Sequence, residues 1–139
     1  MALASVMFRQ INVFYAGSRV DQENVLEDTA KVVVLGDPGV GKSSLIAAAA
    51  TESFDPSPPP CLPPTRLPPA FENIPLLVVD TSTRTENQQS LNTLLEEADV
   101  VLLCYAVDIP ESIRHLRSLW LPEIRKLGTD KPVLLCGCR

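Results

Sequence analysis

Apolar residues along the chain gather in four short runs that predict buried strands. These runs lack regular alternation with polar residues, which is typical of strands covered on both faces of a parallel sheet; they span residues 31–35, 76–80, 100–107 and 132–137. The alanine-rich residues 43–50 favour a helix, and apolar residues at helical spacing predict two more over 88–98 and 110–127, the last kinked by Pro122. This alternation predicts an α/β fold with a doubly wound, mainly parallel sheet.

Two segments lie outside this pattern. Nine of the 13 prolines fall between Pro56 and Pro75, where they oppose helix formation, so we expect a stiff, extended connection. Residues 1–30 carry Arg9 and Arg19 but no acidic residue before Asp21, which resembles a transit peptide weakly. The alternatives are a disordered or loosely docked extension and an uncertain start codon. The folded domain is therefore predicted over residues 31–139.

The turn between the first strand and the first helix carries a phosphate-binding motif. It matches G-x-x-x-x-G-K-[ST], in which glycines let backbone N–H groups wrap a polyphosphate at a helix N-terminus. Lys42 would place a positive charge near the β and γ phosphates, and the Ser43 hydroxyl would bind Mg²⁺. The predicted nucleotide contacts here are Gly36, Asp37, Pro38, Gly39, Val40, Gly41, Lys42, Ser43 and Ser44. Strand, loop and helix in this order predict a P-loop NTPase fold.

Two residues outside the loop complete the predicted site. Asp80 ends the second apolar run, so it reaches the sheet edge where ligands of α/β folds collect, and it suits Mg²⁺ binding there. Thr65 lies within the proline-rich segment, and if this segment crosses the nucleotide, Thr65 reaches Mg²⁺ and the γ-phosphate. The predicted metal ligands are thus Ser43, Thr65 and Asp80. The alternatives are a carboxylate that caps a turn and an ordinary loop threonine.

Composition narrows the classes of function. The chain has 139 residues, which is one domain, and its net charge of −5 argues against sequence-independent binding to nucleic acid. It has no run of about 18 apolar residues, so we expect no membrane contact from this chain itself. The four cysteines show no C-x-x-C pairing and three of them lie in or beside apolar runs, so we expect buried, reduced thiols rather than disulfides or zinc ligands. Cys136 and Cys138 could bind a metal only with partners that the sequence does not reveal. His115, the only histidine, is predicted to be a solvated surface residue.

The sequence resembles the small GTPases, and within them the first GTPase domain of the mitochondrial Rho GTPases, the Miro family. The resemblance covers residues 31–139 and is carried by residues 36–46, 58–68, 79–82, 98–101, 105–108 and 120–122. It implies a switch that binds GTP or GDP with Mg²⁺, with Lys42 and Thr65 in catalytic roles. It also implies effector and regulatory proteins that bind residues 56–75 and 80–86. The implied location is the cytosolic face of the mitochondrial outer membrane, although this chain alone would be cytoplasmic.

Three departures limit what the resemblance implies. Thr83 stands where the second switch has a glycine, so a γ-phosphate contact is expected only from its backbone N–H. Arg84 replaces the glutamine that orients the attacking water, which predicts slow GTP hydrolysis. Cys138 and Arg139 stand where the guanine-reading Asn-Lys begins, so we expect a fragment that is truncated at its C-terminus. A P-loop ATPase or kinase of another lineage and a non-hydrolysing nucleotide-binding interaction module remain as alternatives.

Overall fold

The computed structural model describes residues 29–67, 75–81, 88–127 and 130–138. Nearly all of the predicted N-terminal extension, together with Thr83, Arg84 and Arg139, lies outside these residues. The strands are β1 (Ala30–Leu35), β2 (Thr65–Leu67), β3 (Leu76–Asp80), β4 (Val100–Ala106) and β5 (Val133–Cys138). The helices are α2 (Lys42–Thr51), α3 (Gln88–Glu97), α4 (Pro110–His115), the π-helical η1 (Leu116–Trp120) and α5 (Leu121–Lys126).

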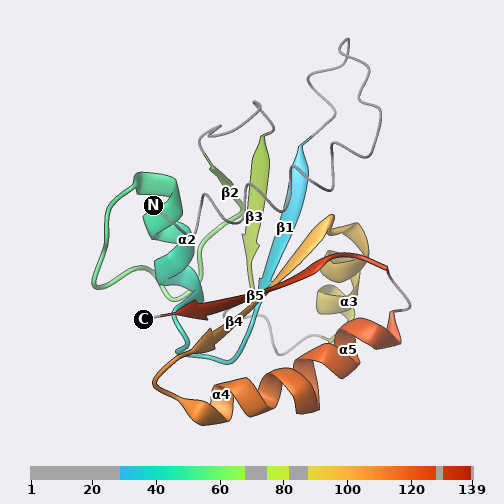
Figure 1. The fold of residues 1–139 in the computed structure, drawn as a ribbon. Coiled ribbons are helices and arrows are strands. Elements are labelled where there is room, and N and C mark those ends of the chain that lie inside the picture. The colour runs from blue at the N-terminus through green and yellow to red at the C-terminus, as the bar shows by residue number, and fades with distance from the viewer. Residues whose placement is uncertain (1–28, 68–74, 82–87, 128–129, 139) are drawn as a thin grey trace.

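The strands form one five-stranded sheet in the order β2-β3-β1-β4-β5. β3, β1, β4 and β5 run parallel, whereas β2 pairs antiparallel with β3 at one edge. In Figure 1, α2 lies on one side of the sheet, and α3 and α5 lie on the other. Helices on both faces of a mostly parallel sheet are the doubly wound arrangement, so the predicted fold class is confirmed.

The central strands are buried on both faces because their apolar side chains alternate between two cores. Val32 and Val34 of β1 pack with α2 through Ile46. Val33 and Leu35 of the same strand face the opposite core. That second core is completed by apolar residues of α3, η1 and α5, which are Leu91, Leu95, Leu116, Trp120 and Ile124. A continuous apolar run, rather than an alternating one, is therefore what this strand requires.

Two details differ from the predictions. The proline-rich connection contains the three-residue strand β2, which lies between Pro64 and Pro68 in the sequence and forms one edge of the sheet. Proline has no backbone N–H to donate to a neighbouring strand, and an edge strand tolerates this because it pairs on one side only. The long third helix is interrupted before Pro122, not at it. Leu121 donates its backbone N–H to the carbonyl oxygen of Leu116, five residues back, and α5 then begins with Pro122 in its first turn, where a missing N–H is tolerated.

None of the helices among the described residues is both long enough and apolar enough to cross a membrane.

Candidate functional site

The phosphate-binding motif forms a tight loop between β1 and α2. Gly36 has a φ of +149°, and a Cβ atom there would lie 2.4 Å from the carbonyl oxygen of Cys104. Only glycine allows this approach, because both the φ angle and the neighbouring backbone oppose a side chain. Val40 fixes the loop from below, since its side chain is buried in the core shared with α2. The loop therefore presents mainly backbone to solvent at the N-terminus of α2.

Lys42, the first residue of α2, folds back beneath the loop. Its Nζ donates to the carbonyl oxygens of Gly36 and Asp37, at 2.7 Å each. Burial lowers the pKa of Lys42, and electrostatic interactions with Cys104, Asp80 and Asp37 oppose this shift. The ammonium group thus lies in the loop that the motif assigns to phosphate, where an anion would relieve its desolvation.

Ser43 and Asp80 meet where β3 ends beside the start of α2. Ser43 Oγ donates to Asp80 Oδ2 at 2.5 Å, and the backbone N–H of Leu62 donates to the same oxygen at 3.1 Å. Both side chains are buried, Asp80 to 1% exposure. A hydroxyl and a carboxylate oxygen in contact next to a phosphate-binding loop are hard donors of the kind that Mg²⁺ binds, so these residues fit that ion.

An open cleft of about 380 Å³ lies over the loop and the start of α2. The cleft is lined by residues of the loop and of the start of α2, which are Pro38, Gly39, Gly41, Lys42, Ser43 and Ser44, and by Pro58, Pro59 and Pro60 of the proline-rich segment. The carbonyl oxygen of Pro60 lies 3.3 Å from Ser43 Oγ. The proline-rich segment thus lies against the start of α2, as expected if this segment crosses the nucleotide, although Pro58–Pro60 were not among the predicted nucleotide contacts.

Thr65 is the predicted site residue that the structure places away from this group. It is the first residue of β2, and its Oγ1 donates to the carbonyl oxygen of Pro63 at 2.8 Å. Thr65 does not line the cleft, and neither do the predicted residues Gly36, Asp37, Val40 and Asp80. Asp80 is nevertheless joined to the lining residue Ser43 by a hydrogen bond, and Gly36 and Asp37 accept hydrogen bonds from the lining residue Lys42. Thr83 lies outside the described residues. The structure therefore brings together the loop, Lys42, Ser43 and Asp80, and it leaves Thr65 on the neighbouring edge strand.

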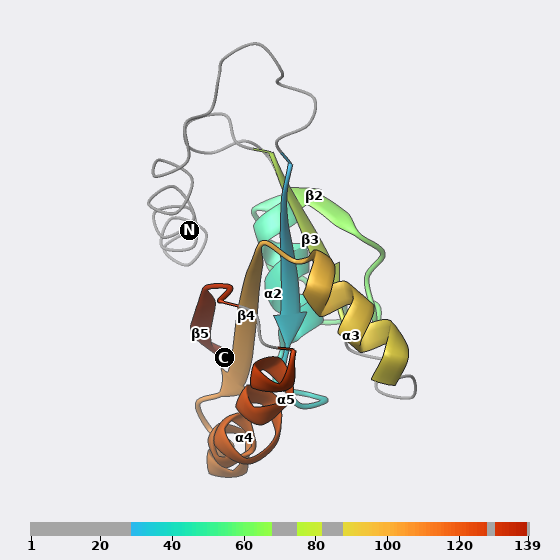
Figure 2. The same ribbon diagram turned by 90° about the vertical axis from the view of Figure 1, so that its right-hand side faces the viewer.

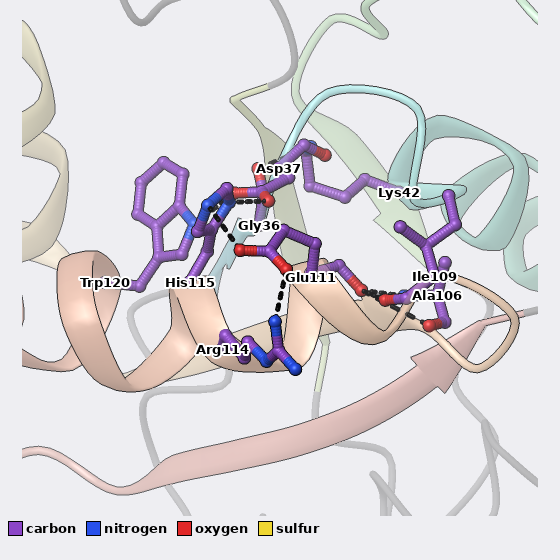
Figure 3. Close-up of polar contacts among 10 residues, drawn as sticks. Gly36, Asp37, Lys42, Ala106, Ile109, Glu111, Arg114, His115 and Trp120 are labelled. Carbon is purple, nitrogen blue, oxygen red and sulfur yellow. Dashed lines mark hydrogen bonds and ion pairs between the residues drawn. The ribbon is translucent and has the colours of Figure 1, made fainter.

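Asp37 is held from the outside of the loop by two side chains far along the sequence (Figure 3). His115 Nδ1 lies 2.5 Å from Asp37 Oδ2, and Trp120 Nε1 donates to Asp37 Oδ1 at 2.9 Å. The side chain of His115 is 45% exposed, so it is only partly the solvated surface residue that we predicted, and its pairing with Asp37 was not predicted. The carboxylate of Asp37 thus faces α4 and η1, so its backbone, rather than its charge, is what the loop offers to an anion.

A family model for the Ras family matches residues 31–139 of this chain. The chain is similar to mitochondrial Rho GTPase 1 of Arabidopsis thaliana, with 47% identity over 113 residues, which cover 80% of this chain and 17% of that protein. It is also similar to mitochondrial Rho GTPase 2 of the same plant, with 47% identity over 78% of this chain and 17% of that protein. The Saccharomyces cerevisiae mitochondrial Rho GTPase 1 is 38% identical over 79% of this chain and 17% of its own length.

The matched region includes all of β1 but its first residue and every later element through β5, and with them the loop, Lys42, Ser43 and Asp80. The chain spans about 17% of the length of these curated relatives. The family match covers the phosphate-binding motif, which lies at the topological switch of the sheet, where β1 lies between β3 and β4. The chain therefore belongs to the Ras family.

Proposed function

We propose that this chain is the nucleotide-binding part of a GTP-dependent switch. The observation that carries the proposal is the geometry around the phosphate-binding loop: Lys42 bonds to the loop carbonyl of Gly36, and Ser43 bonds to Asp80. Lys42 and Ser43 line the cleft together with residues of the proline-rich segment. The loop N–H groups and Lys42 would hold the β and γ phosphates, and the N-terminal end of α2 would favour their negative charge. The Ras family match and the similarity to mitochondrial Rho GTPases support guanine nucleotide as the ligand.

Ser43 and Asp80 are the residues that would hold Mg²⁺, with their present hydrogen bond exchanged for shared contacts to the ion. When bound, Mg²⁺ supplies neutralisation of charge on the phosphate oxygens. Lys42 contributes a fixed positive charge from beneath the loop, and its two carbonyl acceptors keep it in place before the nucleotide arrives. This preorganisation reduces the ordering that nucleotide binding would otherwise require.

The proline-rich segment is the proposed moving part. Thr65 would bind Mg²⁺ or the γ-phosphate only if this segment shifted from its present position in β2, and the backbone N–H of Thr83 is the proposed second γ-phosphate contact. Release of these contacts after hydrolysis would change the surface offered to effector and regulatory proteins. Because Arg84 occupies the position of the water-orienting glutamine, we expect turnover no faster than roughly 10⁻⁴ to 10⁻³ s⁻¹ without a partner.

The cellular role proposed for the switch is in mitochondrial distribution and transport, at the cytosolic face of the outer membrane. Its support is the similarity to the plant and yeast mitochondrial Rho GTPases. Fractionation of cells that express the complete protein from its own gene, with an antibody against this domain, tests the location. Recovery with mitochondria supports the proposal, and exclusive recovery in another fraction contradicts it.

The test of nucleotide binding is equilibrium titration of the chain with fluorescent GTP and ATP analogues, with Mg²⁺ and with a chelator. Lys42→Ala should abolish binding, since it removes the charge beneath the phosphates. Lys126→Ala is the matched control, because Lys126 is an exposed lysine of α5 whose ammonium group forms an ion pair with Glu123 of the same helix. The control should bind as tightly as the unaltered chain.

The outcomes separate the alternatives. Preference for GTP, dependent on Mg²⁺ and lost in Lys42→Ala, supports the proposal. Preference for ATP would instead support a P-loop ATPase or kinase. Binding of GTP without any phosphate release in single-turnover assays would support a non-hydrolysing interaction module. A folded, monodisperse chain that binds neither nucleotide would contradict the proposal for this chain.

A further inference from the structure

Three of the four cysteines lie together directly behind the phosphate-binding loop. Cys104 of β4 is the register partner of Cys136 of β5, so their side chains stand side by side on one face of the sheet. Cys138 lies two residues further along β5 and therefore points to the same face. All three side chains are buried, and all are free thiols. The partner that Cys136 and Cys138 lacked in the sequence is thus Cys104, 32 residues before Cys136.

The spacing of the three sulfur atoms suits a single metal ion. Their Sγ atoms all lie within 4.8 Å of one another. Three thiolates at the usual Zn–S bond length of about 2.3 Å surround an ion with about 4 Å between sulfur atoms, so little movement is required. Thiolates select soft or borderline d¹⁰ ions, whereas Mg²⁺ prefers the oxygen donors found at Ser43 and Asp80. The two groups of side chains therefore differ in the metal they can hold.

The surroundings favour negative charge on one of these sulfur atoms, that of Cys138, and not on the other two. Hydrogen bonds with Cys136 and Cys138, together with burial, raise the pKa of Cys104. The hydrogen bond with Cys104 lowers the pKa of Cys136, but the hydrogen bond with Cys138 and burial outweigh it and raise this pKa to about 11. Lys42 interacts electrostatically with Cys104 and Cys138 from beneath the loop. Hydrogen bonds from Cys104 and then Cys136 lower the pKa of Cys138, with a further contribution from the positive charge of Lys42. A cation would compensate the burial of additional thiolates, which are costly in an apolar core without a partner.

We propose that Cys104, Cys136 and Cys138 bind one thiophilic d¹⁰ metal ion, Zn²⁺ or Cu⁺, between the ends of β4 and β5. Binding displaces the thiol protons to solvent and forms three metal–sulfur bonds, with no change of oxidation state. Cu⁺ accepts three thiolates as a complete trigonal set, whereas Zn²⁺ keeps a fourth position for water. Both ions share the same sulfur chemistry, and separate titrations distinguish them.

The position of the site couples it to the loop. The carbonyl oxygen of Cys104 is the atom that excludes a side chain at Gly36, and the Cβ of Cys138 lies 3.3 Å from where a Cβ at Gly41 would be. A bound ion would therefore tie together the two strand ends that support both glycines. This inference does not depend on the identity of the nucleotide, so it can stand or fall independently of the proposed function.

The test uses the full 139-residue chain, reduced with a phosphine and freed of metal by a chelator. Zn²⁺ and, under anaerobic conditions, Cu⁺ are titrated separately against chromophoric chelators that compete for each ion. Co²⁺ is then added as a spectroscopic probe, because its absorption reports thiolate ligands directly in the unaltered chain. We expect one equivalent of Zn²⁺ or Cu⁺ to bind, sulfur-to-Co²⁺ charge-transfer bands, and a rise in the melting temperature with metal concentration.

The variants are Cys138→Ala, at the end of β5, and Cys61→Ala as the matched control. Cys61 lies in the proline-rich segment and is absent from the three-sulfur group. Cys61→Ala should keep the one-to-one binding and the rise in melting temperature, and Cys138→Ala should lose both. Should Cys138→Ala fail to fold, the Co²⁺ spectrum of the unaltered chain still decides the matter.

Three results would overturn the proposal. The first is the absence of stoichiometric binding of either ion to the folded, reduced chain. The second is a Co²⁺ complex without sulfur-to-metal absorption. The third is equal loss of binding in Cys61→Ala and Cys138→Ala, which would place the metal elsewhere.

Discussion

Gly36→Ala should destabilise the chain strongly, because the phosphate-binding loop leaves no space for a methyl group there. The φ of +149° is a conformation that alanine adopts at a cost of about 1–3 kcal/mol. The added Cβ would also lie 2.4 Å from the carbonyl oxygen of Cys104 and 3.2 Å from its carbon. Separating β1 from β4 to relieve this contact adds about 1–3 kcal/mol. The expected loss in the free energy of unfolding is therefore about 2–6 kcal/mol.

Gly39→Ala is the matched control for this prediction. Gly39 belongs to the same loop and has a φ of +80°, but a Cβ there would meet nothing within 4 Å. Its expected cost is therefore only the conformational one, about 1–2 kcal/mol. Urea denaturation followed by the fluorescence of Trp120, the only tryptophan, measures both variants. Equal destabilisation of the two variants, within about 0.5 kcal/mol, would refute the argument from the Cys104 contact.

Three further substitutions test other parts of the structure. Ser112→Ala should lower the free energy of unfolding, measured by urea denaturation, by about 1–3 kcal/mol, because it leaves the buried backbone N–H of Ala106 without its acceptor. Ser118→Ala, at an exposed serine, should change stability by less than about 0.5 kcal/mol. Equal effects of the two substitutions would contradict the role of the Ser112 hydroxyl. Trp120→Phe should lower the free energy of unfolding by about 1.5–3 kcal/mol, since it removes a hydrogen bond to the Asp37 carboxylate. Urea denaturation followed by circular dichroism measures this loss, and a change below about 0.5 kcal/mol would show that the bond contributes little. Asp80→Asn should reduce the affinity for a GTP analogue in Mg²⁺ to the value measured in chelator, whereas persistent dependence on Mg²⁺ would exclude Asp80 as a ligand.

The main sheet and its two layers of helices could be predicted from local pattern. The apolar runs lack polar alternation because β1, β3 and β4 are covered on both faces. Burial on both faces requires apolar residues at successive positions, and this pattern can be recognised in the sequence. The phosphate-binding loop was equally visible, since its glycines and Lys42 are close together along the chain. Asp80 could be placed near the loop because the carboxyl ends of parallel strands share one edge.

The edge strand β2 was not predicted because it has only three residues and prolines flank it on both sides, which leaves no recognisable strand pattern. Thr65–Leu67 owes its strand conformation to pairing with β3, from Thr65 opposite Val78 to Leu67 opposite Leu76. That pairing is a tertiary interaction with no periodic signal of its own. The π-helical turn before Pro122 was also missed, because the proline predicts disruption of the helix without specifying how the backbone accommodates it.

Long-range contacts account for the rest of what the sequence did not reveal. His115 and Trp120 follow Asp37 by 78 and 83 residues, and only the fold brings them to the loop (Figure 3). Cys104 joins Cys136 through strand register alone. Figure 2 shows how α4 and α5 lie below the carboxyl ends of the strands, where such contacts form. The residue types identify these side chains as able to form hydrogen bonds or bind metal, but they do not reveal which residues they contact.

The most direct test of the nucleotide site is an experimental structure of the chain with Mg²⁺ and a non-hydrolysable GTP analogue. We expect phosphate oxygens within hydrogen-bonding distance of Lys42 Nζ and of the loop N–H groups. We also expect Mg²⁺ to separate Ser43 Oγ from Asp80 Oδ2, which now lie 2.5 Å apart. Nucleotide bound elsewhere, with the Ser43–Asp80 hydrogen bond intact and Lys42 still held only by Gly36 and Asp37, would contradict it.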